Sequence, residues 1–400
     1  MSNMSFMEKL LDGVEVEWLP LGEVTELKRG KRLVKSQLES TGQFAVYQNS
    51  MTPLGYYHQS NTNPDTTFVI CAGAAGEVGY SAAPFWAADD VHYINSGSQL
   101  DSKYLYHFIL TQKGKILSHV RRASIPRLSK TVLDKLLVPI PCPDNPEKSL
   151  AIQSEIVRIL DKFTALTAEL TAELNMRKKQ YNYYRDKLLS FEEGEVEYLP
   201  MGDERVGEFI RGGTFQKKDF TDFGVGCIHY GQIYTYYGTY TNTTKTFISE
   251  SLARKCRKAE SGNLIIATTS ENDDDVCKAV AWLGYDDIAV SSDACIYKHK
   301  LNPKYVSYFF QTECFQRQKK QYITGAKVRR VNASNLAQIL IPVPSPEEQA
   351  RIVAILDKFD ALTSSITEGL PREIELRQKQ YEYYRDLLLS FPKSHSDEAA

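Results

Sequence analysis

An internal repeat constrains the fold of this chain more than any other feature of its sequence. Blocks of identical or closely similar residues occur twice, in the same order, along the 400 residues. They are VEWLPLG at 16–22 and VEYLPMG at 196–202, LVPIPCP at 137–143 and LIPVPSP at 340–346, ILDKF at 159–163 and 355–359, and QYNYYRD at 180–186 and QYEYYRD at 380–386. A repeat of this length predicts two copies of one structural unit.

Each copy has the same plan: a variable segment opened by Leu-Pro-x-Gly, a closing strand in which prolines alternate, and a long helix. The variable segments, about 20–143 and 200–344, share little sequence, but both contain short apolar runs bounded by Gly, Asn and Ser clusters, which are typical of strands and loops. We expect an α/β fold with two mixed α/β domains that do the same kind of work on different targets.

The repeat also predicts the domain boundaries. The expected parts are a first domain with an N-terminal segment at 1–144, a central spacer helix at 145–195, a second domain at 196–344, a C-terminal spacer helix at 345–391 and a flexible tail at 392–400.

The segments that follow the domains have apolar residues at steps of three and four, as in a coiled-coil seam. The first contains a tandem repeat, TAELTAEL, with the spacer residues Thr167, Leu170, Thr171 and Leu174. The repeat puts two steps of four together, from Leu166 to Leu170 and on to Leu174, which is a stutter. A helix of roughly 40 residues is on the order of 60 Å long and needs a partner for its apolar face.

We expect the two long helices to pair antiparallel, with the domains at opposite ends and related by a pseudo-twofold axis. Residues 6–11 would then meet the end of the second helix near Phe391, which makes the fold nearly circular. The alternative is that each helix only caps its own domain.

Helix boundaries are marked in both copies. Ser345, Pro346 and Glu348 form a capping-box pattern at the start of the second helix, and Asn145 with the following proline marks the first. Gly369, Leu370 and Pro371 predict a break in the second helix where the first is continuous.

Basic residues gather at equivalent places in the two variable segments. One cluster lies at the start of each domain, and another precedes the proline-alternating strand, with Arg127 lying 12 residues before Pro139 and Arg330 lying 12 before Pro342. Duplicated clusters predict two sets of phosphate contacts, although a solvated face is the alternative for any single cluster. The candidate DNA-binding residues are Lys28, Arg29, Lys31, Arg32, Arg121, Arg122, Arg127, Lys217, Lys218, Lys319, Lys320, Lys327, Arg329 and Arg330.

The remaining sequence features favour recognition over catalysis. The balance of 48 Lys+Arg against 50 Asp+Glu excludes a uniformly basic protein but allows local basic patches. Phosphate-binding loops, nucleophile elbows and zinc motifs are missing from the sequence, so we expect no catalytic and no metal site. Scattered cysteines and the lack of a long apolar run predict a cytoplasmic protein without membrane contact. The acidic run at 271–275 could bind a metal, but an exposed loop is the simpler interpretation.

Several duplicated motifs together resemble one family. They are the Leu-Pro-x-Gly openings, the Pro-Ile-Pro and Pro-Val-Pro strand ends, the pairs Glu348-Gln349 and Ile352-Val353, and the Tyr-x-Tyr-Tyr-Arg-Asp-x-Leu-Leu-Ser-Phe helix ends. They resemble the specificity subunits of type I restriction-modification systems, and the TAEL repeat is similar to that of the EcoR124-like (type IC) subgroup.

The resemblance implies two target-recognition domains, each reading one half of a bipartite double-stranded DNA site, while the helices set the half-site spacing. It implies docking of two modification (methyltransferase) subunits, which carry S-adenosylmethionine, and of restriction (motor and nuclease) subunits, which use ATP and Mg²⁺. This chain itself would hold no cofactor. A duplicated coiled-coil adaptor without DNA binding is the alternative, and a self-contained methyltransferase would need cofactor motifs that the sequence lacks.

Overall fold

A computed structural model describes residues 13–364 and 368–392 of the chain. Within these residues the chain divides into two compact units, with boundaries between Glu169 and Leu170 and between Ile374 and Glu375. Each unit combines one globular domain with the start of the helical segment that follows it and the end of the other helical segment. Residues 6–11 and 393–400, to which the predicted circular contact and most of the predicted tail belong, lie outside the described residues.

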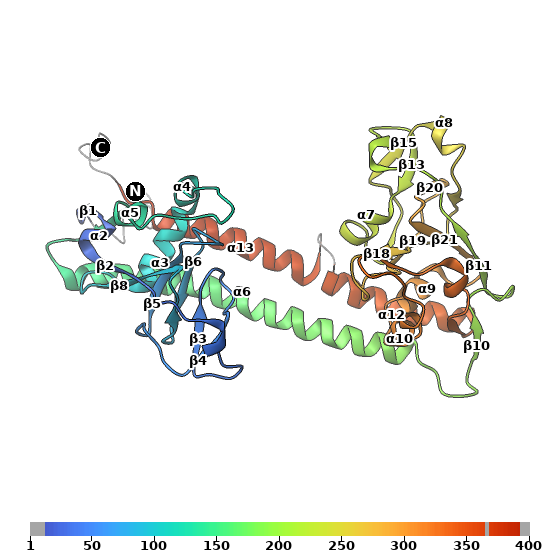
Figure 1. Ribbon diagram of the computed structural model, residues 1–400, viewed down its shortest axis with the longest axis horizontal. Coiled ribbons are helices and arrows are strands. Elements are labelled where there is room, and N and C mark those ends of the chain that lie inside the picture. The colour runs from blue at the N-terminus through green and yellow to red at the C-terminus, as the bar shows by residue number, and fades with distance from the viewer. Residues whose placement is uncertain (1–12, 365–367, 393–400) are drawn as a thin grey trace, which may run out of the picture. The chain divides into compact units, whose positions relative to one another are not determined.

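The first domain contains two sheets that enclose apolar side chains. The larger sheet has the antiparallel order β2 (Thr25–Arg29), β8 (Val91–Ser96), β5 (Thr66–Ile70) and β6 (Val78–Ser81), and the smaller has the order β4 (Gly55–Tyr57), β3 (Phe44–Tyr47) and β7 (Trp86–Ala87). Strand β5 is buried along its length, and α3 (Ser102–Thr111) packs on the larger sheet (Figure 1). Short helices complete the domain: α2 (Leu21–Val24), η1 (Lys35–Gln37), α4 (Lys113–Ser118) and α5 (Lys130–Asp134).

The second domain is built in the same way with larger sheets. One has the order β11 (Gly207–Arg211), β21 (Ala294–His299), β17 (Leu264–Ala267), β19 (Ala279–Trp282) and β14 (Tyr240–Thr241). The other has the order β12 (Phe220–Thr221), β15 (Thr246–Ile248), β13 (Val225–Ile228), β20 (Ile288–Val290) and β16 (Lys258–Ala259). The pair β18 (Thr269–Ser270) and β22 (Arg329–Arg330) stands apart. The helices are η2 (Lys217–Asp219), α7 (Tyr230–Thr235), α8 (Glu250–Ala253), α9 (Pro303–Phe309), α10 (Glu313–Lys320) and α11 (Ala333–Leu336). Both domains are therefore mixed α/β, as predicted.

The repeated sequence blocks at the two ends of each domain pair with each other. In the first domain β1 (Val16–Pro20) runs antiparallel to β9 (Leu137–Pro141), with Trp18 opposite Pro139. In the second, β10 (Glu197–Pro200) and β23 (Leu340–Val343) place Tyr198 opposite Pro342. In both domains, therefore, the strand that enters the Leu-Pro-x-Gly motif pairs with the proline-alternating strand, and the register of the pairing is the same.

The spacer segments are helical over most of their predicted lengths. The first contains the continuous helix α6 (Pro146–Leu188), which ends before the predicted boundary at 195. The second contains α12 (Pro346–Ser364) and α13 (Gly369–Leu388), so the predicted break is confirmed. Gly369 has a positive φ of 76°, a conformation that favours glycine, and Pro371 lies in the first turn of α13, where its missing N–H is tolerated.

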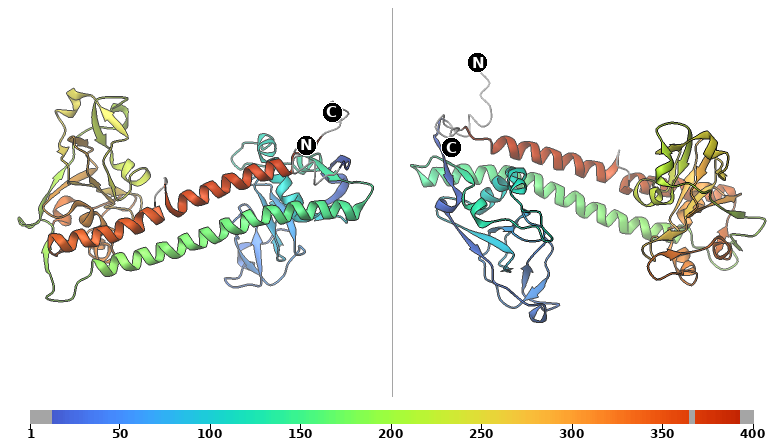
Figure 2. Two further views of the ribbon diagram at one scale, coloured as in Figure 1. Left: turned by 180° about the vertical axis from the view of Figure 1, so that it is seen from behind. Right: turned by 45° about the horizontal axis from the view of Figure 1, so that its top comes forward.

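Within each unit the beginning of one helical segment packs against the end of the other, so the segments run antiparallel (Figures 1 and 2). In the first unit, Phe163 of α6 stacks on Tyr384 of α13 with 5.1 Å between ring centroids. In the second, Tyr184 of α6 stacks on Phe359 of α12 at 5.7 Å. The predicted antiparallel pairing is confirmed inside the units, whereas the pseudo-twofold relation between the domains stays a prediction.

The first unit also brings both ends of the described chain together. Trp18 of β1 donates its indole N–H to the carbonyl oxygen of Pro392 at 3.1 Å. Phe391 is buried and meets Tyr104 edge to face, with 6.3 Å between ring centroids. The C-terminal end of the second helical segment is therefore part of the first domain's core.

Helix capping follows the sequence only in part. The hydroxyl of Ser345 accepts from the backbone N–H of Glu348 at 3.3 Å, and Asn145 caps α6 in the same way through Lys148 at 3.0 Å. The second half of the predicted capping box does not form, because the Glu348 carboxylate pairs with Arg351 at 2.6 Å. None of the helices in the described part of the chain is long and apolar enough to cross a membrane.

Candidate nucleic-acid interface

The basic cluster at the start of each domain is attached to a turn of the large sheet. Arg29 ends β2 and donates through Nε to the carbonyl oxygen of Asp89 at 2.7 Å. Arg211 ends β11 and makes the equivalent contact with the carbonyl oxygen of Ser292 at 3.4 Å. Although the surrounding sequences differ, both arginines lie on the turn that precedes the next strand of the sheet, β8 or β21.

The second cluster lies in a hairpin that has the same backbone hydrogen bonds in both domains. In the first hairpin, residues 121–127, Arg121 and Arg127 exchange N–H to carbonyl bonds of 2.9 and 3.1 Å. In the second hairpin, residues 324–330, Thr324 and Arg330 exchange bonds of 2.9 and 2.9 Å. Arg127 and Arg330 are therefore equivalent in structure as well as in their distance from the proline-alternating strand.

Each hairpin is attached at the end of the central buried strand of its domain. The residue after the first hairpin, Leu128, donates its N–H to the carbonyl oxygen of Cys71 at 2.9 Å, directly after β5. The residue after the second, Val331, donates to the carbonyl oxygen of Thr268 at 3.1 Å, directly after β17. Both hairpins thus lie at the C-terminal end of an equivalent strand, β5 in the first domain and β17 in the second.

In the first domain the two basic clusters are connected at this end of β5. The backbone N–H of Cys71, at the base of the first hairpin, donates to the carbonyl oxygen of Asp90 at 2.7 Å, and the neighbouring Asp89 holds Arg29. In the second domain, Thr268 donates its N–H to the carbonyl oxygen of Asp293 at 2.9 Å, which connects the base of the hairpin to the turn that holds Arg211. In both domains the base of the basic hairpin is therefore hydrogen-bonded to the turn that holds the arginine of the other cluster.

Most of the predicted residues have exposed side chains. The exposed side chains are Arg29, Lys31, Arg32, Arg121, Arg122, Arg127, Lys217, Lys218, Lys320, Lys327 and Arg330. Lys28 is less available, because its ammonium group lies 2.9 Å from the Glu26 carboxylate. Within the described residues, Arg121, Arg122 and Arg127 form no ion pair with a carboxylate, so their charges are open to an anionic partner.

The structure corrects the prediction for Lys319, which is only 1% exposed. Its ammonium group lies inside the second domain and donates to the carbonyl oxygens of Asp274 at 3.0 Å and Val276 at 2.9 Å. It cannot reach a DNA phosphate. Lys319 lies four residues after the buried Phe315 in α10, and this helical spacing was the signal that could have indicated burial.

The acidic run at 271–275 has a structural partner. Asp273 pairs with Arg329 of the second hairpin at 2.8 Å, and Arg329 also donates to the carbonyl oxygen of Gly325. In the described part of the chain, no group of three or more His, Cys, Asp and Glu side chains is placed to hold a metal ion. The acidic loop therefore orients a basic hairpin, and Arg329 is half-buried rather than free.

The pattern of charged residues in the sequence did not indicate one feature of the hairpins. Each carries an exposed aliphatic side chain two residues before its closing arginine: Ile125 in the first and Val328 in the second. Comparing the two sequences position by position, rather than by charge, could have found them.

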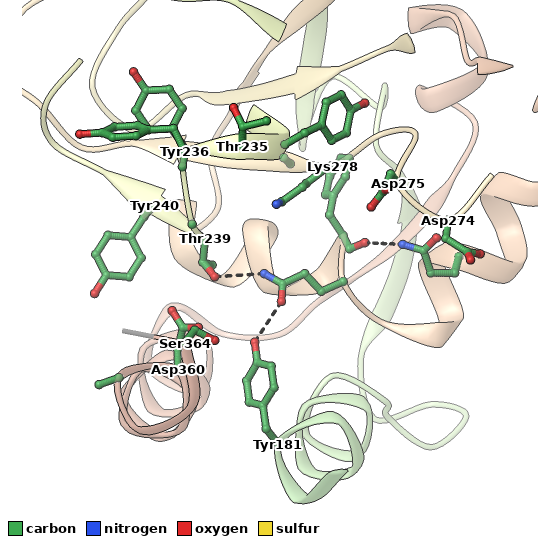
Figure 3. A pocket seen from close by; sticks show the side chains of 18 of the residues that line it. Tyr181, Thr235, Tyr236, Thr239, Tyr240, Asp274, Asp275, Lys278, Asp360 and Ser364 are labelled. Atoms are coloured by element: carbon green, nitrogen blue, oxygen red, sulfur yellow. Dashed lines mark hydrogen bonds between the residues drawn. The ribbon is translucent and has the colours of Figure 1, made fainter. Parts of the chain in front are cut away.

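A cavity of about 820 Å³ lies in the second unit between the domain and the helices (Figure 3). Tyr181 of α6 donates its hydroxyl to the side-chain oxygen of Gln311 at 3.0 Å, and the Gln311 amide donates to Thr239 at 3.2 Å. Burial raises the pKa of Asp360, which lines the same cavity from α12. Since these bonds link the helices to the domain, we interpret the cavity as part of the contact between the helices and the domain, and not as an active site.

The predicted spacer residues all lie in α6. The Thr167 hydroxyl donates to the carbonyl oxygen of Phe163 at 2.9 Å, Leu170 and Leu174 are half-buried, and Thr171 is exposed. The boundary between the two compact units falls inside this tandem repeat, after Glu169. The repeat therefore occupies the helical connection from one unit to the other.

Comparisons with known proteins agree with this architecture. A family model described as the type I restriction modification DNA specificity domain matches residues 13–177 and 199–376. The specificity subunit of the type I restriction enzyme EcoR124I/EcoR124II of Escherichia coli is 41% identical, over 98% of this chain and 98% of its own length. A putative type I restriction enzyme specificity subunit of Haemophilus influenzae is 33% identical, over 98% of this chain and 99% of its own length.

Solved structures share the fold. The crystal structure of the type I restriction-modification system S subunit from M. genitalium aligns with a TM-score of 0.54 and 16% identity, covering 96% of this chain and 98% of the other. A chain from a structure on complex assembly and conformational transition of the type I R-M system aligns with a TM-score of 0.56 and 14% identity, covering 94% of this chain and 97% of the other.

Proposed function

Because this chain belongs to the family of type I restriction-modification DNA specificity subunits, we propose that its two domains read the two halves of one bipartite DNA site. The chain supplies DNA sequence specificity and is a recognition subunit rather than an enzyme. The division into halves is supported by one observation: the same basic hairpin extends from the same place in both domains, although the surrounding variable segments share little sequence. A common backbone within differing surroundings is what two readers of unlike sequences need.

The helical segments then carry the partner contacts. Tyr183 of α6 and Tyr383 of α13 occupy equivalent positions in the repeat, and 60% and 64% of their surfaces are exposed. Exposed tyrosines are favoured in protein interfaces, because the ring gives contact area and the hydroxyl can still form a hydrogen bond. Two equivalent sites on one chain suit two copies of one partner, which supports the docking of two modification subunits.

We propose the rest of the assembly on the basis of the family. The modification subunits bring S-adenosylmethionine, and restriction subunits with ATP and Mg²⁺ join the complex, so this chain needs no cofactor of its own. The assembly works on double-stranded DNA in the cytoplasm.

The test is to co-express the chain with its modification subunit and to map methylated adenines in the host DNA by sequencing. The expected result is one bipartite sequence with a fixed gap, which disappears when the modification subunit is expressed alone. If a complex forms but its methylation shares no sequence, or if no DNA is bound, the chain is an adaptor and the proposal is wrong.

A further inference from the structure

Both basic hairpins present one aliphatic side chain to solvent at the same position. Ile125 is 53% exposed in the first hairpin and Val328 is 45% exposed in the second. Each lies two residues before the closing arginine, Arg127 or Arg330. A single exposed aliphatic residue is ordinary on a protein surface, but two at one position of a duplicated hairpin are a pattern.

The pattern extends to the neighbouring positions. Aligned by their closing arginines, the hairpins read RRASIPR at 121–127 and TGAKVRR at 324–330, so both have alanine, a β-branched aliphatic residue and arginine at alternate positions. The variable segments share little sequence elsewhere. Since these side chains are exposed, folding of the domain does not explain why both copies have them.

The hairpin backbones hold the tips in place. The paired hydrogen bonds between Arg121 and Arg127, and between Thr324 and Arg330, close each loop at its base. In the second hairpin, β22 also pairs with β18, which places Arg330 opposite Thr269. A tip fixed in this way loses little conformational entropy when it enters a groove, and a β-branched side chain has few rotamers to lose.

We propose that Ile125 and Val328 are specificity-determining residues that make apolar contacts with bases, one in each half of the DNA site. This inference rests on the proposed function and assigns a role within it. The flanking arginines supply the charge that brings a hairpin to the phosphates, whereas the aliphatic tip has no favourable contact with a phosphate. On a base, it can pack against a thymine methyl group in the major groove or insert between two base pairs.

The experiment uses the complex of the full chain with its modification subunit and compares Ile125→Ala, Val328→Ala and the wild type by selection from randomised duplex DNA. Ile125→Ala should lower the preference at one or two base pairs of one half-site by about 50-fold, the loss expected for removing three buried methyl or methylene groups. The other half-site should stay unchanged. Val328→Ala should do the reverse, so that each variant is the control for the other.

Further variants separate base contacts from phosphate contacts. Val328→Ile keeps the apolar tip and should keep the preference, whereas Val328→Thr keeps the shape but replaces one of the two methyl groups by a hydroxyl and should lower the preference. Arg330→Gln should weaken binding to all sequences and reduce the salt dependence by about one counterion, while Val328→Ala should leave the salt dependence unchanged.

Two modified duplexes distinguish the sources of the apolar contact. If the tip packs on a thymine methyl group, deoxyuridine at the affected position reproduces the loss. If the tip inserts between base pairs, deoxyuridine has no effect and a neighbouring 2-aminopurine becomes more fluorescent when the wild-type complex binds. Either result supports the proposal.

The proposal is overturned if both alanine variants keep the wild-type preferences at both half-sites, or if they reduce the salt dependence as Arg330→Gln does. Failure of the proposed function is distinguishable, because then the wild-type complex itself would select no bipartite sequence.

Discussion

The ammonium group of Lys319 lies inside the second domain, where it donates to two carbonyl oxygens of the loop that begins with the acidic run. The loop ends at Cys277, a buried residue with a φ of 71°, in the region that favours glycine. Asp273 in the same loop holds Arg329 of the second hairpin. Lys319 thus acts on the second hairpin indirectly, by fixing the loop that orients one of its arginines.

Replacing Lys319 by methionine keeps most of the apolar length of the side chain and removes both hydrogen bonds. The carbonyl oxygens of Asp274 and Val276 then lose this donor, so the free energy of unfolding should fall by about 2–3 kcal/mol. Urea unfolding followed by circular dichroism measures the change. The matched control is Lys320→Met, in which an exposed neighbour is changed and stability should hold. If Lys319→Met were as stable as the wild type but bound DNA with a lower salt dependence, Lys319 would be a phosphate contact after all.

For single residues, the sequence predicted which positions of the two copies are equivalent, but it did not predict which of their side chains are exposed. The equal spacing of Arg127 and Arg330 from the proline-alternating strands predicted that these positions are equivalent, and both arginines close a hairpin with the same backbone hydrogen bonds. The burial of Lys319 depends on the carbonyl groups of a loop some 45 residues earlier in the chain, and charge patterning contains no information on that contact. The aliphatic tips were missed because an isolated Ile or Val has no meaning until the hairpin shows that it is exposed.

Each long helix is joined to its domain by a buried glutamine at an equivalent position. Gln153 of α6 accepts from the N–H of Asp101 at 2.8 Å and donates to the carbonyl oxygen of Gln99 at 2.9 Å. Gln349 of α12 accepts from the N–H of Asn302 at 2.8 Å and donates to the carbonyl oxygen of Pro344 at 2.9 Å. The accepted bonds hold the residues that cap α3 and α9, so each long helix fixes the start of one earlier helix of the domain that it packs on.

A second pair of contacts repeats beside these glutamines. Lys103 of α3 lies 2.8 Å from Asp161 of α6, and Lys304 of α9 lies 2.7 Å from Asp357 of α12. The aspartates belong to the repeated ILDKF block, which explains why this block recurs. The sequence predicted the helices and a break at residues 369–371, which form the first turn of α13, but the contacts described here connect residues some 50 positions apart and required the fold.

Changing either glutamine to leucine should weaken the contact of its helix with the domain. Gln349→Leu leaves the N–H of Asn302 and the carbonyl of Pro344 without these partners in a buried place, which should lower the free energy of unfolding by about 2–4 kcal/mol. Gln153→Leu should have an effect of similar size in the first unit. Thermal unfolding of both variants, with the exposed Gln378→Leu as the control, measures this. If these hydrogen bonds contributed nothing to stability, both variants would unfold at the midpoint temperature of the wild type.

For the whole molecule, the proposed function requires that two half-sites be kept at a fixed distance. Helix α6 belongs to both compact units, and the division between them falls within its TAEL repeat. The second connection is interrupted, because α12 ends at Ser364 and α13 begins at Gly369. Of the two helical connections, α6 is therefore the continuous one, and its length should determine the spacing of the DNA site.

Deleting residues 171–174 removes one TAEL unit and tests this idea. An α-helix that is four residues shorter loses about 6 Å in length and about 40° in rotation. Set against roughly 3.4 Å per base pair, the preferred gap between half-sites should shorten by one or two base pairs. Both half-site sequences should persist, because the deletion touches none of the basic clusters. Mapping methylated adenines in cells that express the variant with its modification subunit measures the gap and the half-sites in one experiment.

The control is Thr171→Ser, which keeps the helix length and should keep the wild-type gap. If the deletion variant methylated the wild-type sequence with its original gap, the length of α6 could not be what sets the spacing.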